Sequence, residues 1–369
     1  MLLLARDESV IAAAQAAARC LHVPSPVLVG SVEGALARLA GPGAGPRGVI
    51  CEAPLAAMSL DRLLSAADED SDAGVVLVGE VAPALPARVL HSAPEAQSLA
   101  ATLQRAMRRS PAAAADRKSL QAGIRGGEIT LRYQPVVRLA DRHLVMFEAL
   151  ARWDHAGRLI GPDSFVPLSE RHGLARELAA AVLARLTRDM AVLRWHGVPV
   201  AVNLPLSLLL RFDLPHWLRR HMHRPASRPG ILLELTESER VRDMARLRLA
   251  LERAGQAGFP VLLDDIAPLE DRRALLDLPF AGVKLDRGLV EALPGSAPAR
   301  SFARSVVREA HRRGMSVTAE GVANAALWQA VAALGVDQAQ GWAVGRALPA
   351  GALASWATAW RAQPPQARR

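Results

Sequence analysis

The chain has 369 residues, of which 51% are apolar and 22% charged, and its formal net charge is +9. This length suffices for two domains with their own hydrophobic cores, and the composition excludes a collagen-like or disordered chain. No apolar stretch reaches the roughly 18 residues of a membrane span, and the two cysteines, Cys20 and Cys51, cannot form a disulfide framework. We therefore expect a soluble protein of a reducing cytoplasm with no membrane partner.

The net charge is unevenly distributed along the chain. Residues 1–110 carry 9 basic and 11 acidic side chains, net −2, whereas the remainder carries 36 and 25, net +11. A basic surface could attract nucleic acid, anionic lipid or a phosphorylated small molecule, or it could only keep the protein in solution. No aromatic stacking platform accompanies the charge, so we expect no nucleic-acid partner.

In the first part of the chain, short apolar runs alternate with helical patterns, which predicts a small doubly wound parallel α/β sheet. The predicted strands are 2–4, 27–29, 49–51, 75–78 and 89–90, and the predicted helices are 9–19, 32–39 and 96–107. The order of these elements and the size of the segment resemble those of the receiver domain of response regulators. The acidic pair, phosphate-accepting aspartate, hydroxyl and lysine of a receiver are missing, although Glu52 could mimic an aspartyl phosphate. Residues 1–108 are therefore predicted to form a degenerate receiver-like domain that contacts an unknown signalling protein.

Residues 109–115 form a predicted linker, and residues 116–369 form a predicted second domain. Apolar strand-like runs recur in this domain with helical segments between them, which predicts a TIM-like (β/α)₈ barrel. An open doubly wound sheet of eight strands is the alternative. The predicted strands are 129–133, 144–149, 198–202, 231–235, 260–263, 282–285, 315–318 and 339–344.

The residues at the ends of these strands share a chemical character, because most of them are carboxylates or amides. A barrel brings its strand ends to one face, where barrel enzymes place their active sites. Oxygen ligands of this kind select Mg²⁺, Mn²⁺ or Ca²⁺ over zinc, and converging carboxylates need cations to offset their repulsion. The residues are Glu148, Asn203, Glu234, Glu237, Asp264, Asp265, Lys284, Asp286, Glu320 and Gln340.

The motifs around these residues form an ordered series. Residues 147–153 read F-E-A-L-A-R-W, and residues 133–135 read Y-Q-P. The series continues with G-P-D-S-F-V-P-L at 161–168, V-N-L at 202–204, E-L-T-E at 234–237, D-D at 264–265, K-L-D at 284–286, A-E-G-V at 319–322 and Q-G at 340–341. Over about residues 116–355 the chain resembles the EAL domain, the bacterial cyclic-di-GMP phosphodiesterase family.

The resemblance implies two metal ions, Mg²⁺ or Mn²⁺, and hydrolysis of cyclic-di-GMP to linear pGpG. Glu148, Asn203, Glu234 and Asp264 would hold one ion, while Asp264, Asp265 and Glu320 would hold the second. Lys284, with Asp265 and Glu320, would serve catalysis by orienting or activating the attacking water. Substrate contacts would come from Gln134, Arg152, Asp286 and Gln340, and Glu237 would anchor the loop that helps to assemble the metal site and a possible homodimer.

The chain departs from the family pattern after the paired aspartates. Where the family continues F-G-T-G-Y-S-S, residues 266–272 read I-A-P-L-E-D-R, and Ala323 replaces a glutamate. Loss of glycine and gain of Pro268 remove backbone freedom, and altered support of metal ligands lowers metal affinity or activity. The altered loop favours a receptor, but the intact metal ligands and Lys284 favour an enzyme, which is the main hypothesis. A cyclic-di-GMP receptor with weak or no turnover and a protein-interaction scaffold are the alternatives.

Overall fold

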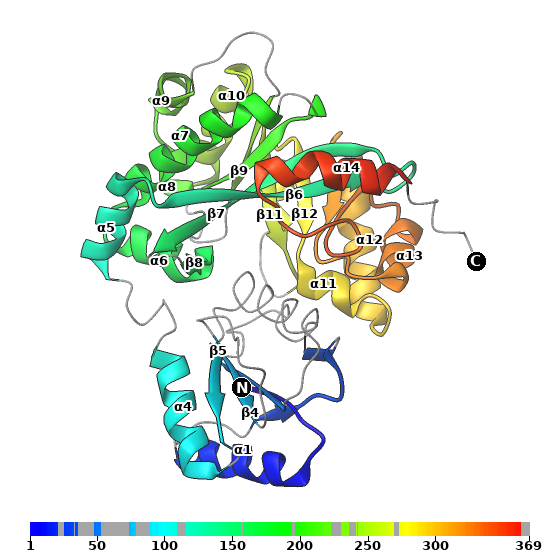
Figure 1. Cartoon of the computed structure of the whole chain (residues 1–369). Coiled ribbons are helices and arrows are strands. Elements are labelled where there is room, and N and C mark those ends of the chain that lie inside the picture. The colour runs from blue at the N-terminus through cyan, green and yellow to red at the C-terminus, as the bar shows by residue number, and fades with distance from the viewer. Residues whose placement is uncertain are drawn as a thin grey trace. The chain divides into compact units, whose positions relative to one another are not determined.

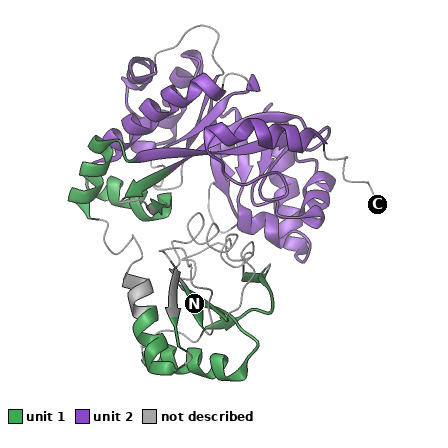
Figure 2. Cartoon of the chain, in the orientation of Figure 1, with its two compact units in different colours: residues 1–128, 152–172 green, residues 129–151, 173–369 purple. Residues whose placement is uncertain are grey.

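The computed structural model describes most of the second predicted domain and parts of the first. The described residues are 1–20, 26–32, 34–35, 48–52, 74–78, 89–93, 95–108, 116–155, 158–193, 196–222, 230–235, 241, 243–268 and 273–362. They form two compact units, one of residues 1–128 and 152–172 and one of residues 129–151 and 173–369 (Figure 2). The predicted linker 109–115 lies outside the described residues, so the predicted domain boundaries stay a prediction.

The N-terminal segment contains a five-stranded parallel sheet in the order β2-β1-β3-β4-β5. This is the order of one class of doubly wound α/β folds, which confirms the fold predicted for this segment. Helices α1 and α4 pack against each other, and the core contains Leu3, Ile50, Val76, Leu99 and Leu103. The elements are β1 (Leu2–Leu4), α1 (Glu8–Cys20), β2 (Val27–Leu28), β3 (Gly48–Glu52), β4 (Gly74–Val78), β5 (Val89–Ser92) and α4 (Ala96–Arg108). Of the helix predicted at 32–39, only residues 32, 34 and 35 are described.

The rest of the chain builds the predicted barrel (Figure 1). Its strands read as nearly continuous apolar runs because they are buried on both faces, as in β12, where all four residues are buried. The barrel strands are β6 (Ile129–Arg138), β7 (Leu144–His155), β9 (Val200–Leu204), β10 (Ile231–Leu235), β11 (Val261–Ile266), β12 (Gly282–Leu285), β13 (Ser316–Ala319) and β14 (Gln338–Gln340). The ring closes because β6 pairs with both β14 and β7, which rules out the open eight-stranded sheet.

The barrel differs from an all-parallel one at its first strand. Strand β6 pairs antiparallel with β14. All neighbouring strands from β7 through β9, β10, β11, β12 and β13 to β14 pair in parallel. The chain passes from β6 to β7 through a short turn at 139–143 with no crossover helix, and a connection this short can only reverse the strand direction. An additional strand, β8 (Arg158–Ile160), pairs antiparallel with the end of β7.

Helices connect most of the barrel strands, and several begin at a side chain that caps the first turn, such as Asp116, Asp243, Ser296 and Asn324. The helices are α5 (Arg117–Gly126), α6 (Pro162–Arg171), α7 (Ala175–Leu193), α8 (Leu206–Leu209), α9 (Leu214–His221), α10 (Met244–Gln256), α11 (Arg287–Ala292), α12 (Ala297–Arg312), α13 (Ala325–Ala333) and α14 (Leu353–Ala362), with 3₁₀ helices η4 (Arg273–Asp277) and η5 (Ala350–Ala352). Among the described residues, no helix has the length and apolar character needed to cross a membrane.

Candidate functional site

The polar residues predicted at the strand ends lie on successive strands of the barrel. Each strand from β7 around to β14 contributes at least one of them, because parallel strands end on the same side. They are Glu148 on β7, Asn203 on β9, Glu234 on β10, Asp264 and Asp265 on β11, Lys284 on β12, Glu320 directly after β13 and Gln340 on β14.

The ammonium group of Lys284 lies at the centre of this group of side chains. Its Nζ is 3.4 Å from Glu148 Oε2 and 3.0 Å from Glu234 Oε2. It is also 3.1 Å from Asp264 Oδ1 and 2.5 Å from Glu320 Oε1. Lys284 is only 1% exposed, so these contacts form away from solvent and are weakly screened. The structure therefore brings four of the predicted acidic residues around one buried cation.

The electrostatic surroundings keep Lys284 protonated. Burial by itself lowers the pKa of its ammonium, but the charges of Asp264, Glu148, Glu234 and Glu320 outweigh burial and raise that pKa well above its ordinary value. A lysine in this state donates hydrogen bonds and presents a fixed positive charge at neutral pH.

The pKa values of the carboxylates around Lys284 shift in different directions. Burial and the charge of neighbouring carboxylates raise the pKa of Glu234, Asp264 and Glu320. Burial also acts on Glu148, but the charge of Lys284 and hydrogen bonds from neighbouring side chains outweigh it, and the pKa of Glu148 lies below its ordinary value. The group therefore holds more carboxylates than one lysine can offset, and their mutual repulsion favours the binding of protons or of further cations.

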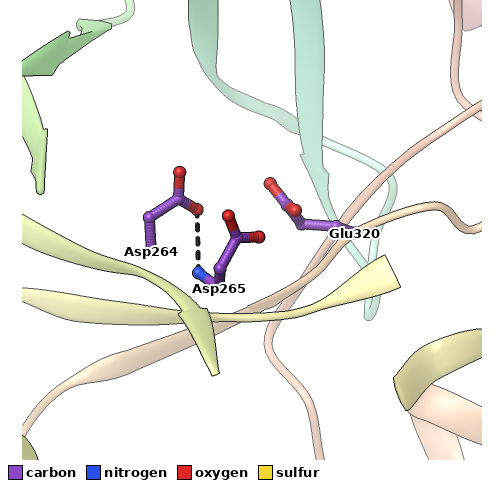
Figure 3. A group of neighbouring side chains, drawn as sticks. All are labelled: Asp264, Asp265 and Glu320. Atoms are coloured by element: carbon purple, nitrogen blue, oxygen red, sulfur yellow. Dashed lines mark hydrogen bonds between the residues drawn. The ribbon is translucent and has the colours of Figure 1, made fainter. Parts of the chain in front are cut away.

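Three carboxylates beside Lys284 point toward one another (Figure 3). One oxygen each of Asp264, Asp265 and Glu320 lies within 4.8 Å of the others. Asp265 adopts φ 54°, a left-handed conformation that is uncommon for residues other than glycine, at a register shift between β11 and β12. This irregularity places two consecutive carboxylates beside Glu320, whereas a regular strand would direct them to opposite faces.

Two glutamine side chains connect the first barrel strand to Glu148. Gln340 Nε2 donates to Glu148 Oε2 at 2.5 Å and to Gln134 Oε1 at 3.1 Å, and Gln134 Nε2 donates to the Gly345 carbonyl at 3.2 Å. Asn203 Nδ2 donates to the other oxygen of Glu148 at 3.0 Å. The sequence analysis assigned both glutamines to substrate contacts and missed this chain of hydrogen bonds, because the partners are about 200 residues apart in the chain.

Glycine is required where the ends of β13 and β14 meet. Gly341 has φ 146°, and a Cβ atom there would lie 2.4 Å from the backbone nitrogen of Val322. Val322 N donates to the Gln340 carbonyl at 2.9 Å, so the backbone after Glu320 is held against the backbone beside Gln340. The Q-G pair of the sequence motif thus has a steric reason.

Three further residues were predicted for the site: Arg152, Asp286 and Glu237. Arg152 is 4% exposed on β7 and belongs to the first unit. Asp286 follows β12 and caps α11, with its Oδ1 accepting from Leu289 N at 3.0 Å. Glu237 lies outside the described residues. The substrate and loop roles of these three residues stay predictions.

The donor set fits divalent cations with a preference for oxygen. Four carboxylates contact one ammonium group, and a fifth, Asp265, is grouped with two of them; the four are Glu148, Glu234, Asp264 and Glu320. Glu234 Oε1 is buried with no hydrogen-bond partner among the described residues, although a buried carboxylate oxygen normally has one. Ligands on opposite sides of a Mg²⁺ or Ca²⁺ ion are separated by about 4–5 Å, and the three grouped oxygens all lie within 4.8 Å of one another.

Comparison with known proteins identifies several relatives of the barrel. An uncharacterized signaling protein of Caulobacter vibrioides is 34% identical over 248 residues, 66% of this chain and 30% of that protein. Cyclic di-GMP phosphodiesterase NbdA of Pseudomonas aeruginosa is 31% identical over 256 residues, 67% of this chain and 33% of that protein. Probable cyclic di-GMP phosphodiesterase PdeB of Escherichia coli is 31% identical over 243 residues, 64% of this chain and 46% of that protein. The match therefore spans less than half of each of these relatives.

A solved structure and a family model agree with this result. The structure described as PaMucR phosphodiesterase, c-di-GMP complex, aligns with a TM-score of 0.57 and 29% identity, covering 64% of this chain and 98% of that one. The model of the EAL domain matches residues 117–347. Because this match spans well over half of the chain, we conclude that the protein belongs to the EAL domain family.

Proposed function

We propose that this protein hydrolyses cyclic-di-GMP to linear pGpG with two Mg²⁺ or Mn²⁺ ions per site. The observation that carries the proposal is the buried Lys284 ammonium among four carboxylates, with Asp264, Asp265 and Glu320 grouped beside it. Relatives named as cyclic di-GMP phosphodiesterases support the choice of substrate.

The barrel residues would divide the work of holding metal and substrate. Glu148, Asn203, Glu234 and Asp264 would hold one ion, and Asp264, Asp265 and Glu320 would hold the other. Bound there, the ions would make water nucleophilic at neutral pH and stabilise charge on the phosphoryl oxygens. We assign Glu237 to anchoring the loop, and we assign substrate contacts to Gln134, Arg152, Asp286 and Gln340.

Lys284 would act as a hydrogen-bond donor to the attacking water. Because its pKa is raised, its ammonium keeps its protons and can orient that water while stabilising negative charge that develops during attack. Gln340 and Gln134 would hold the Glu148 carboxylate in place through their hydrogen bonds. The reaction adds one water across one P–O bond and leaves a 5′-phosphate and a free 3′-hydroxyl.

The direct test is to incubate the purified protein with cyclic-di-GMP and resolve the products by chromatography. We expect pGpG with Mg²⁺ or Mn²⁺, no product after chelation, and inhibition by Ca²⁺, whose larger radius and looser geometry disturb the two-ion spacing. The variant Glu148→Ala should abolish cleavage. Turnover that survives complete chelation would contradict the assignment of this site.

The second candidate function is a receptor that binds cyclic-di-GMP and cleaves it slowly or not at all. It is favoured by the segment after Asp265, where Ile266 is buried and paired with Leu285, and Pro268 follows. The family has a glycine-rich loop here, and a loop without that backbone freedom would support the ligands less well. Binding of cyclic-di-GMP without product would favour this candidate, and absence of both would leave the interaction scaffold.

We further propose that residues 1–108 are a degenerate receiver-like domain that contacts a signalling protein, and that the barrel can form a homodimer. Glu52 is the last residue of β3, the third strand along the chain, at whose end a receiver has its phosphate-accepting aspartate. Its Oε2 accepts hydrogen bonds from the backbone N–H groups of Arg6 and Asp7 at 2.6 and 3.0 Å. Incubation with acetyl phosphate should therefore add no phosphoryl group by intact mass. Stable phosphorylation of Glu52 or Asp7 would contradict this proposal.

A further inference from the structure

An open groove lies between the α8–α9 connection and helix α10, formed by residues that the phosphodiesterase site does not use. It has a volume of about 560 Å³, and its lining includes Arg211, Phe212, Arg246, Leu249 and Arg253. All of these residues belong to the second unit.

Two apolar side chains of the groove are largely exposed to solvent. Phe212 is 82% exposed and Leu249 is 58% exposed, the two largest values among the exposed large hydrophobic residues. On α10 the buried face is formed by Leu247, Ala250 and Leu251, so Leu249 breaks the pattern by placing a leucine on the opposite face. Exposed apolar residues gathered in one place mark interaction surfaces more often than scattered ones.

The charged side chains of the groove are mostly arginines. Asp213, which also lines it, is paired with Arg211 at 2.9 Å and with Arg176 at 3.5 Å. Arg253 lies over the ring of Phe212 at 5.1 Å, and its Nε is buried without a hydrogen-bond partner among the described residues. Arg246 is exposed and forms no ion pair within the described chain. The groove therefore combines an apolar centre with surplus positive charge.

We propose that this groove binds an acidic segment of a partner protein. An apolar side chain of the segment would pack between Phe212 and Leu249, and flanking carboxylates would pair with Arg246 and Arg253. Exposed aromatic and arginine side chains are the residue types that contribute most to protein–protein binding. The charge complementarity selects a segment rich in aspartate and glutamate.

Other occupants fit these observations less well. A small molecule is normally buried over about 70–90% of its surface, and side chains as exposed as Phe212 and Leu249 show that this groove is too open for that. A bilayer presents a flat surface that does not enter a concave groove. A second copy of the chain brings a net charge of +9 to a surface that is already basic.

The test is fluorescence anisotropy on the full-length protein with a fluorescein-labelled helical peptide. The peptide carries two leucines one turn apart with glutamates on both sides, the spacing by which a helix occupies a groove. We expect saturable binding with Kd on the order of 10 µM, and no binding when serines replace the leucines. Phe212→Ala and Arg246→Glu should each weaken binding about tenfold or more. The matched variants Val192→Ala and Arg304→Glu, at exposed sites on α7 and α12, should change it less than about twofold.

Several results would overturn the proposal. One is absence of binding at about 1 mM peptide, and another is equal weakening in the matched variants, which would indicate nonspecific attraction. Phe212-dependent binding to phosphatidylglycerol vesicles would assign the groove to a membrane surface. A Phe212-dependent dimer in sedimentation would assign it to a second copy. Circular dichroism of each variant verifies that it is folded.

Discussion

The buried lysine provides a sharp test of how the barrel balances its charges. The variant Lys284→Met keeps a long side chain in the same volume but removes the ammonium that contacts Glu148, Glu234, Asp264 and Glu320 at 2.5–3.4 Å. With an effective dielectric constant of about 20, each contact corresponds to an attraction of about 5 kcal/mol before desolvation is counted. Desolvation of the ions offsets most of this attraction. Removing one partner from a buried charge cluster therefore destabilises a protein by about 3–5 kcal/mol.

This magnitude corresponds to a large shift in thermal stability. For a domain of this size, 1 kcal/mol changes Tm by about 2–4 °C, so the barrel transition of Lys284→Met should fall by about 6–20 °C in chelator. The loss should be smaller at about pH 5 than at about pH 8, because protonated carboxylates repel one another less. Mn²⁺ should recover part of the loss, since a divalent cation supplies the missing positive charge.

The assay is thermal unfolding followed by circular dichroism in chelator and in Mn²⁺. Lys118→Met is a matched control, because Lys118 is the only other lysine of the chain and is exposed on α5. The control should melt within about 1–2 °C of the natural protein, as expected for a surface substitution. If the Tm of Lys284→Met equals that of the control at high pH and Mn²⁺ raises both values equally, Lys284 does not balance the charge of these carboxylates.

Three further predictions concern other parts of the chain. Tyr133→Phe removes a buried hydrogen bond of 2.9 Å to Asp189 Oδ2 and should lower the free energy of unfolding by about 1–3 kcal/mol in urea, and an unchanged midpoint would contradict this. The pKa of Glu128 is lowered, chiefly by a hydrogen bond from an indole N–H, so its stabilising effect is present above about pH 4.5 and is lost as pH falls through the lowered value. Glu128→Gln should therefore reduce the fall of the urea midpoint as the pH is lowered into the acid range. An unchanged dependence of the midpoint on pH would refute the assignment. Burial raises the pKa of the Cys51 thiol to about 12, whereas Cys20 is exposed. A maleimide should therefore label Cys20 in the native protein and Cys51 only after unfolding. Peptide mass spectrometry measures the labelling of each cysteine, and equal labelling in the native protein would contradict this prediction.

The sequence by itself determined the elements of the barrel and the chemistry of its strand ends. Continuous apolar runs separated by helical patterns predicted the strands, because a strand covered on both faces must be apolar throughout. The residue types at the ends of those runs, from Glu148 to Gln340, identified a site rich in oxygen ligands. These properties are local, so they can be interpreted without knowing which strands pair.

Tertiary structure alone decided how those side chains meet. Strand pairing and register determine three features of the site. They are the antiparallel pairing of β6 with β14, the left-handed backbone of Asp265, and the hydrogen bonds that link Gln134 and Gln340 to Glu148. The four carboxylates around Lys284 come from positions up to 136 residues away in the chain. Their distances and pKa shifts arise only once the barrel closes, because burial and charge proximity are properties of the folded state.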